Sequence, residues 1–368
     1  MRFDRPHGAL AIGVLFTLGV IGCVIGGIID PVTFFRAWLC SYLFWLGVPL
    51  AGVALVLVHD LSGGNWMATA RPALNAAIAT MPLATLAGIP AFVDLDALYP
   101  WTHPAFDLAN VFYLNPTAFF IRYGIYVVLW NLLAAYALFG PREGRDPIAP
   151  SFSWISGLGL IVLAFSASFA AIDWILSLEP KFWSSIFPYT QASSWFNTGM
   201  AFVLLAVAIT GWPADERRAH MTDLAQILLA TTIFWAYVEF IQFLIIWEEN
   251  LKSEIPWYLT RINSVWLPAL DVAAGLGFIV PFFVLLWAPT KRNRAVVATV
   301  CMLIVISRIA ETWFLVMPEF KESAPPFWLD VAALFALGGG IALLFAWGWR
   351  YASRATPGGA PVWMTDHG

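Results

Sequence analysis

The feature that most constrains this chain is the recurrence of apolar runs long enough to cross a lipid bilayer. A membrane-spanning helix needs about 20 consecutive, mostly apolar residues. Ten such runs follow one another, most of them joined by short connections. They cover residues 9–29, 33–58, 72–94, 116–139, 152–178, 190–211, 222–247, 262–288, 294–317 and 326–349. The sequence therefore predicts an all-α polytopic membrane protein with about ten transmembrane helices.

Composition supports this prediction. The chain is 60% hydrophobic and 11% charged, with a mean hydropathy of +0.76, whereas a soluble domain carries about 25% charged residues. We therefore expect a single integral membrane domain over residues 1–368, with a disordered tail from 350 to 368. Cys23, Cys40 and Cys301 are isolated and no C-x-x-C spacing occurs, so we expect neither a metal site nor a disulfide framework.

Lysine and arginine residues predict the orientation in the membrane. Cytoplasmic loops carry an excess of these residues, and an even number of spans puts both termini on one side. Twelve of them fall on the terminal side and five on the other. The twelve are Arg2, Arg5, Arg71, Arg142, Arg145, Arg217, Arg218, Lys291, Arg292, Arg294, Arg350 and Arg354. Both termini are therefore predicted to be cytoplasmic.

Ionisable residues inside the predicted spans are the candidate functional residues. A charge at the centre of a membrane helix costs about 2.5–3.5 kcal/mol, so such residues usually face a bundle interior. All of them fall in the predicted outer half of the bilayer, and acids outnumber arginines by four to two. They are Arg122, Asp173, Glu239, Asp271, Arg308 and Glu311. Excess buried carboxylates suit proton handling, although a structural ion network holding the helices together is the alternative.

A short pattern near two of these acids occurs twice. The segment 311–320 (ETWFLVMPEF) resembles 173–182, with an acid before a Trp, Leu, Pro and Phe at the exit of an apolar run. This repetition predicts a duplicated membrane unit. Histidine adds a further constraint, because all five histidines lie in loops, tails or helix ends. A transmembrane b-type haem needs histidine ligands inside the bundle, so we expect no haem in this chain.

Three segments carry a resemblance to a known family. The stretch 42–66, the SLEP exit at 177–180 and the stretch 234–258 together resemble the NrfD/PsrC-like (polysulfide-reductase-type) membrane subunits, and most closely the ActF type of alternative complex III, a quinol:cytochrome c oxidoreductase. The chain departs from the family pattern at Asp60 and Lys181, where the family often has histidine.

The resemblance implies an architecture and a setting in the cell. Helices 2–5 (33–178) and helices 6–9 (190–317) would form two four-helix bundles of like orientation, flanked by the first and last helices. The family lies in the bacterial inner membrane. Its redox centres sit in partner subunits, namely a periplasmic iron–sulfur protein and c-type cytochromes that carry haem c, beside a paralogous NrfD-like subunit, membrane lipids and in some cases a terminal oxidase. No nucleic-acid partner is expected.

Function is expected to follow from this setting. The chain would contribute to quinol and proton handling near the periplasmic face, with quinone or quinol as a possible ligand but no resident cofactor. Two alternatives remain open at this point. One is a structural scaffold for the paralogous quinol-oxidising subunit. The other is a secondary transporter, because duplicated bundles with buried acids occur there too.

Overall fold

The computed structural model describes residues 6–103, 110–140, 154–210, 218–320 and 327–354, and their regular secondary structure is entirely helical. Ten of the described helices are long and apolar enough to cross a membrane. They are Gly8–Ile29, Pro31–Ser62, Arg71–Phe92, Pro116–Phe139, Trp154–Leu178, Phe187–Thr210, His220–Glu249, Leu267–Leu286, Arg294–Phe320 and Trp328–Arg350. The predicted all-α class with ten spans is thus confirmed.

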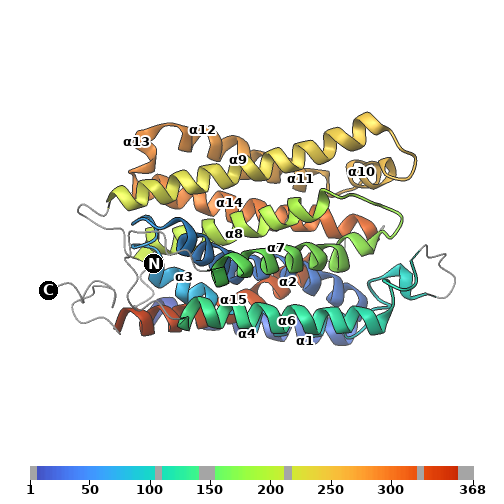
Figure 1. Ribbon diagram of the computed structural model, residues 1–368. Helices are drawn as coiled ribbons and strands as arrows, with labels where there is room; N and C mark the ends of the chain where they lie inside the picture. Colours follow the sequence, from blue (N-terminus) through green and yellow to red (C-terminus); the bar gives the residue numbers. More distant parts are fainter. Residues whose placement is uncertain (1–5, 104–109, 141–153, 211–217, 321–326, 355–368) are drawn as a thin grey trace.

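The long helices run along one common direction and alternate in sense (Figure 1). Helix α1 (Pro6–Ile29) begins, and α15 (Trp328–Arg354) ends, at the same end of the molecule. We call this the terminus end. We call the opposite end, where α7 (Trp154–Trp174) finishes and α8 (Phe187–Thr210) starts, the cleft end.

Proline breaks the third span, which the sequence predicted as one helix. It consists of α3 (Arg71–Ile78), α4 (Met81–Leu86) and α5 (Gly88–Phe92). A proline inside a helix removes one backbone donor and clashes with the carbonyl four residues earlier, and Pro82 and Pro90 fall in this span. Threonine hydroxyls bond backbone carbonyls near these breaks: Thr80 donates to Ala77 at 2.6 Å and Thr85 donates to Met81 at 2.9 Å.

The eighth span also differs from its predicted limits of 262–288. The chain forms a separate short helix, α10 (Ile255–Ile262), and the span itself begins at Leu267. It comprises α11 (Leu267–Ala274), a π-helical turn at Gly275–Ile279 and α12 (Val280–Leu286). Such π-turns occur mostly as single insertions in α-helices, often at functional sites.

The predicted tail and one predicted helix end also need correction. Helix α15 continues to Arg354, so residues 350–354 are helical rather than part of a disordered tail. The rest of the predicted tail, 355–368, lies outside the described residues. Helix α2 (Pro31–Ser62) runs four residues beyond its predicted end at 58, and this extension includes Asp60.

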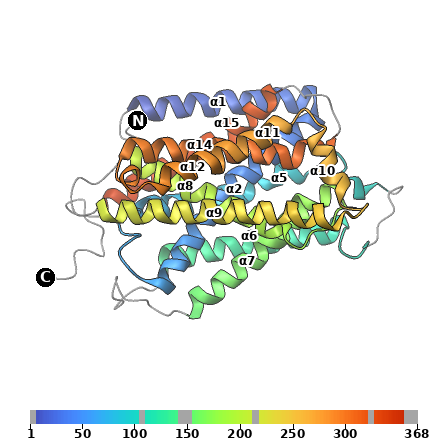
Figure 2. The same cartoon turned by 90° about the horizontal axis from the view of Figure 1, so that it is seen from above.

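Helices α2 and α8 form the centre of the packing (Figure 2). Helix α2 contacts α3, α4, α5, α6 (Pro116–Phe139) and α7, whereas α8 contacts α9 (Arg218–Glu249) and α14 (Arg294–Val316). The two sets share a broad interface, in which α8 packs against α2 and α7. Helix α1 packs mainly on α15, which in turn packs on α2 and α3.

Glycines allow α2 and α8 to approach closely. A Cβ added at Gly199 would lie 2.3 Å from the Cβ of Ala51, and one at Gly47 would lie 3.1 Å from Trp195. The Trp195 indole also donates to the Leu43 carbonyl at 2.7 Å. Small residues are typical of membrane helix interfaces, because association there depends on close van der Waals contact rather than on release of water.

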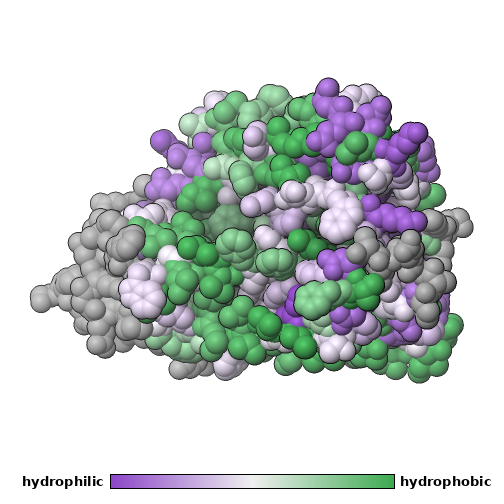
Figure 3. Space-filling view, turned by 45° about the vertical axis from the view of Figure 1, so that its right-hand side comes forward, coloured by the Kyte–Doolittle hydropathy of each residue, from purple (hydrophilic) through white to green (hydrophobic). Residues whose placement is uncertain are grey.

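On the face shown in Figure 3, hydrophobic residues cover much of the length of the helices, and most of the hydrophilic residues lie toward the cleft end. Large apolar side chains are exposed along α9, among them Phe234, Tyr237 and Phe240. Glu248 and Glu249 at the end of the same helix are exposed charges. This distribution suits lipid contact along the helices and water contact at their ends.

Replacing Gly199 with alanine is expected to destabilise the fold, because the added methyl group has no room beside Ala51. Overpacking of this kind costs about 1–3 kcal/mol. The matched control is Gly124→Ala in α6, where nothing lies within 4 Å of the added Cβ. It should leave stability unchanged or raise it by up to about 1 kcal/mol. Denaturant unfolding in micelles measures both, and equal stability of the two variants would contradict close α2–α8 packing.

Candidate functional site

A cleft of about 990 Å³ opens at the cleft end. Both copies of the repeated pattern contribute to its wall. Helix α7 is followed by a 3₁₀ turn at Leu176–Leu178, and α14 is followed by one at Met317–Phe320. Phe182 and Phe320, which are equivalent in the repeat, both line the cleft. The charged lining residues are Arg36, Asp96, Glu179, Lys181, Lys252 and Glu319.

Asp173 lies at the end of α7, only 1% exposed, and forms a buried ion pair with Arg122 of α6. Arg122 Nε lies 2.8 Å from Asp173 Oδ2, and the Tyr126 hydroxyl donates to the same oxygen at 2.7 Å. The guanidinium also donates to the Tyr113 carbonyl at 2.9 Å and stacks on the Tyr113 ring at 3.9 Å. We call these four residues the Asp173 cluster.

Polar atoms in and beside the Asp173 cluster have no described partners. Among the described residues, no hydrogen-bond partner reaches Asp173 Oδ1, the Trp174 indole nitrogen or the Tyr42 hydroxyl. The Tyr42 and Trp174 rings lie 5.3 Å apart. Buried polar atoms are rarely left unpaired, and exceptions are frequent where a protein binds or transfers something. These atoms therefore mark the cluster as a candidate site.

Tyr99 connects the Asp173 cluster to the cleft. It lines the cleft, and its hydroxyl donates to the Trp174 carbonyl at 3.2 Å. Burial raises the pKa of Tyr99 well above its usual value, and the negative charge of Asp173 raises it further. Tyr99 is therefore neutral at physiological pH and lies between cleft and carboxylate.

Glu311 of α14 is the corresponding buried acid in the second copy of the repeat. Arg308 Nη1 lies 2.9 Å from Glu311 Oε2, an i, i+3 pair on one helix. Ser194 of α8 donates to Oε2 at 2.6 Å, and the Trp235 indole of α9 donates to Oε1 at 2.8 Å. The Arg308 guanidinium stacks on Trp235 at 3.5 Å. These four residues form the Glu311 cluster, in which both carboxylate oxygens accept hydrogen bonds.

Glu239 and Gln242 extend this cluster along α9. Glu239 lies within electrostatic reach of Arg308 and Glu311. No described donor reaches Glu239 Oε1 or Gln242 Oε1. Because the two residues are three apart on one helix, their side chains lie on the same face. Glu239 rather than Glu311 therefore presents the open acceptor atom in the second unit.

Asp271 does not join either cluster, so the expectation that it faces the interior was wrong. Its side chain is exposed on α11. The same span approaches the Glu311 cluster through its π-turn instead. A Cβ at Gly277 would lie 2.1 Å from Arg308 Nη2. The backbone of this span, and not its acid, covers the arginine.

Sequence reasoning missed a buried ion pair beneath the cleft. Arg261 of α10 is 1% exposed, and its Nη2 lies 2.6 Å from Glu319 Oε1 and donates to the Leu315 carbonyl at 2.7 Å. It stacks on Trp257, a cleft residue, at 3.5 Å. Burial lowers the pKa of Arg261 to about 10, and Glu319 opposes that effect. The sequence signal was weak, because position 261 falls just outside the predicted span 262–288.

A second missed feature lies near the terminus end. Asp60 is 6% exposed and accepts a hydrogen bond from Ser156 at 3.1 Å. The Ser156 hydroxyl also lies 3.1 Å from the Tyr136 hydroxyl. The sequence placed no acid within the inner half of the spans, because α2 was predicted to end before Asp60.

The fold and the two buried clusters define the chain as a polytopic α-helical membrane protein with paired charges inside its helix bundle. The sequence matches no protein-family model and no curated protein. Within the described residues, no group of three or more His, Cys, Asp or Glu side chains is placed to hold a metal ion. The cleft lining and the unpartnered atoms of the clusters are candidate ligand contacts.

Replacing Arg122 with methionine should destabilise the protein by about 3–5 kcal/mol, because it leaves the buried Asp173 carboxylate without its cation. The double variant Arg122→Met, Asp173→Leu removes both charges and should recover most of that loss. Unfolding midpoints in micelles, compared across the two single variants and the double variant, measure the coupling. A double variant as unstable as the sum of the singles would show that the pair does not interact.

Proposed function

We propose that the chain is an integral membrane subunit of a quinol-oxidising respiratory complex of the alternative complex III type. In this proposal it contributes to quinol and proton handling at the cleft end and docks redox partners there. The observation that carries the proposal is a buried acid cluster at Asp173 that Tyr99 connects to a cleft, in whose wall both repeated helix exits meet. The resemblance of 42–66, 177–180 and 234–258 to NrfD/PsrC-like subunits indicates quinol oxidation as the reaction.

Proton transfer is the step that the residues of this chain would assist. Oxidation of a quinol to a quinone releases two electrons and two protons. The electrons pass to the redox centres of partner subunits, and the protons need nearby acceptors. Asp173 Oδ1 and Glu239 Oε1 are buried carboxylate oxygens that no described donor occupies, so each is open to a proton. A positioned acid or base of this kind contributes typically about 10²–10⁴-fold to a rate.

Orientation is part of the same proposal. The excess of lysine and arginine at the terminus end puts that end in the cytoplasm of a bacterium by the positive-inside rule. The cleft end then faces the periplasm, and the docking partners are an iron–sulfur protein, c-type cytochromes and a paralogous membrane subunit. The mixed charges around the cleft, among them Lys181, Lys252 and Asp96, supply contacts for soluble partners.

The test replaces each proposed acceptor by its uncharged amide. Asp173→Asn and Glu239→Gln should each lower quinol:cytochrome c turnover of the assembled complex by about tenfold or more. Asp271→Asn is the matched control, because Asp271 is an acid in a span but is exposed. It should keep wild-type turnover.

Assembly is followed in parallel by co-purification of the partner subunits and by their haem spectra. Wild-type turnover in fully assembled Asp173→Asn and Glu239→Gln complexes would remove the proton role. If no redox subunit co-purifies with the tagged wild-type chain, the proposal that the chain belongs to a respiratory complex is refuted.

A structural scaffold is the alternative that one observation favours. Both oxygens of Glu311 are saturated by donors from three helices, as expected of an ion network that holds helices together. Under this alternative Glu311→Gln weakens assembly, and Asp173→Asn leaves turnover per assembled complex unchanged. A map of the complex with an isoprenoid tail in the cleft would favour the proposed function instead.

A further inference from the structure

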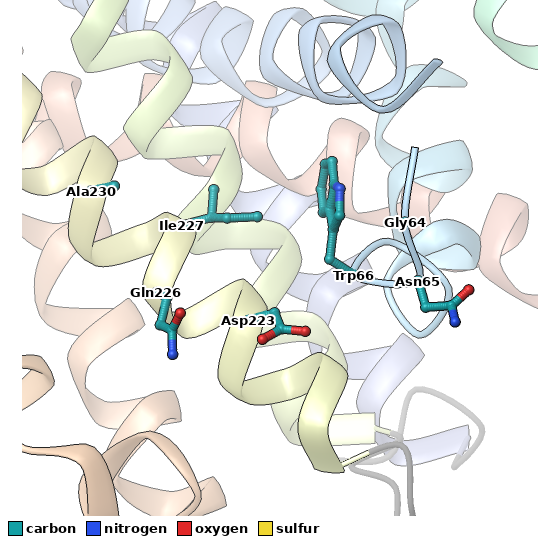
Figure 4. Close-up of a pocket in the computed structure, with 7 residues that line it drawn as sticks. All are labelled: Gly64, Asn65, Trp66, Asp223, Gln226, Ile227 and Ala230. Atoms are coloured by element: carbon teal, nitrogen blue, oxygen red, sulfur yellow. The ribbon is translucent and has the colours of Figure 1, made fainter. Parts of the chain in front are cut away.

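A groove of about 510 Å³ at the terminus end lies apart from both clusters and the cleft. One wall is α9 and the other is the turn that follows α2 (Figure 4). Its lining residues are Gly64, Asn65, Trp66, Asp223, Gln226, Ile227 and Ala230. We propose that this groove binds a phospholipid with a primary ammonium headgroup, namely phosphatidylethanolamine. The proposal is independent of the proposed function.

The groove spans the depth at which a bilayer changes from polar to apolar. The span His220–Glu249 has 30 residues, which at about 1.5 Å per residue is about 45 Å. The hydrocarbon core is about 30 Å thick, so roughly 7 Å of helix extends beyond it at each end. Asp223, the fourth residue of the span, therefore lies at headgroup depth. Ala230, about two turns further on, lies at acyl-chain depth.

The α9 wall of the groove has the same polar-to-apolar order as a lipid. Asp223, Gln226, Ile227 and Ala230 occur at i, i+3, i+4 and i+7, so they share one helix face. The first two are polar and the last two are apolar. Asp223, Gln226 and Ala230 are exposed, so these side chains are accessible from the membrane side of the bundle.

The opposite wall repeats this order. Asn65 lies at the same end of the groove as Asp223, and farther along Ile227 points toward the Trp66 ring (Figure 4). The Trp66 indole nitrogen donates to the Gly63 carbonyl at 3.0 Å. The polar edge of the indole is thereby held by its own turn, which leaves carbon atoms for an acyl chain. Gly64 has φ +90°, a conformation that glycine adopts without strain and that shapes this turn.

Charge selects the headgroup. Among the described residues that line the groove, Asp223 is the single charged side chain. A carboxylate attracts an ammonium group and repels the net negative charge of phosphatidylglycerol. A primary ammonium donates hydrogen bonds to the carboxylate, which the quaternary ammonium of phosphatidylcholine does not. The amides of Asn65 and Gln226 supply donors for the phosphate and glycerol oxygens.

The test uses the purified full-length chain, delipidated and offered equal amounts of phosphatidylethanolamine, phosphatidylcholine and phosphatidylglycerol with identical acyl chains. Native mass spectrometry then counts the lipid that remains bound. The wild-type chain should retain phosphatidylethanolamine preferentially. Asp223→Asn should lower that retention about threefold to fivefold, as expected for a partly exposed ion pair. Ala230→Phe should lower it by filling the acyl-chain end.

The matched control is Glu249→Gln, an exposed acid at the other end of α9, which should leave retention unchanged. Because all three substituted side chains are exposed, their unfolding midpoints should equal that of the wild type. Equal retention of phosphatidylglycerol, or unchanged retention in both Asp223→Asn and Ala230→Phe, would overturn the proposal.

A second measurement keeps the proposal testable if a variant folds poorly. Photoreactive phosphatidylethanolamine added to the wild-type chain should label the peptide that contains residues 220–230. Labelling confined to other peptides would refute the assignment. Capture of a protein by a photoreactive residue at position 226 in the native membrane, with no lipid adduct, would equally refute it and would assign the groove to a protein partner.

Discussion

The rest of the structure depends on one constraint, which is that charged groups in an apolar interior need partners from within the protein. Asp173 on α7 obtains its cation and a hydroxyl donor from α6. Glu311 on α14 obtains donors from α8 and α9 in addition to Arg308 of its own helix. Each acid thereby connects separate helices, and losing one partner would leave a buried charge uncompensated. The positions of the charges and the arrangement of the helices thus depend on each other.

The two copies of the repeated pattern end their helices in the same way, but their buried acids have different hydrogen-bond partners. In the first, Arg and Tyr come from the neighbouring span and Asp173 keeps one open oxygen. In the second, both carboxylate oxygens of Glu311 accept hydrogen bonds, and the oxygen without a described donor belongs to Glu239 on α9. Under the proposed function, the two acceptors therefore come from different positions: Asp173 at the exit of its own helix, and Glu239 on a neighbouring helix.

Several features could be predicted from local sequence, and others could not. The Arg308–Glu311 pair follows from i, i+3 spacing on one helix and is present at 2.9 Å. The pairing of Arg122 with Asp173 joins residues 51 positions apart, so no local spacing indicates it. Asp271 was placed wrongly because the neighbouring residues of α11 are apolar on every side, which leaves no polar stripe to show its outward face. The break near Pro82 and the π-turn at Gly275 went unpredicted, because hydropathy does not report changes in helix geometry.

By itself, the sequence determined that the chain is helical and polytopic, with ten spans and acids within them, because hydrocarbon thickness and backbone hydrogen bonding leave few other solutions for runs of about 20 apolar residues. The tertiary structure decided which acids are buried, which cations meet them and which helix exits share a cleft. Those outcomes depend on contacts between residues far apart in the chain, such as the close approach of Gly47 and Gly199. Because membrane segments of this kind are apolar on every face, their local sequence does not indicate which contacts they form.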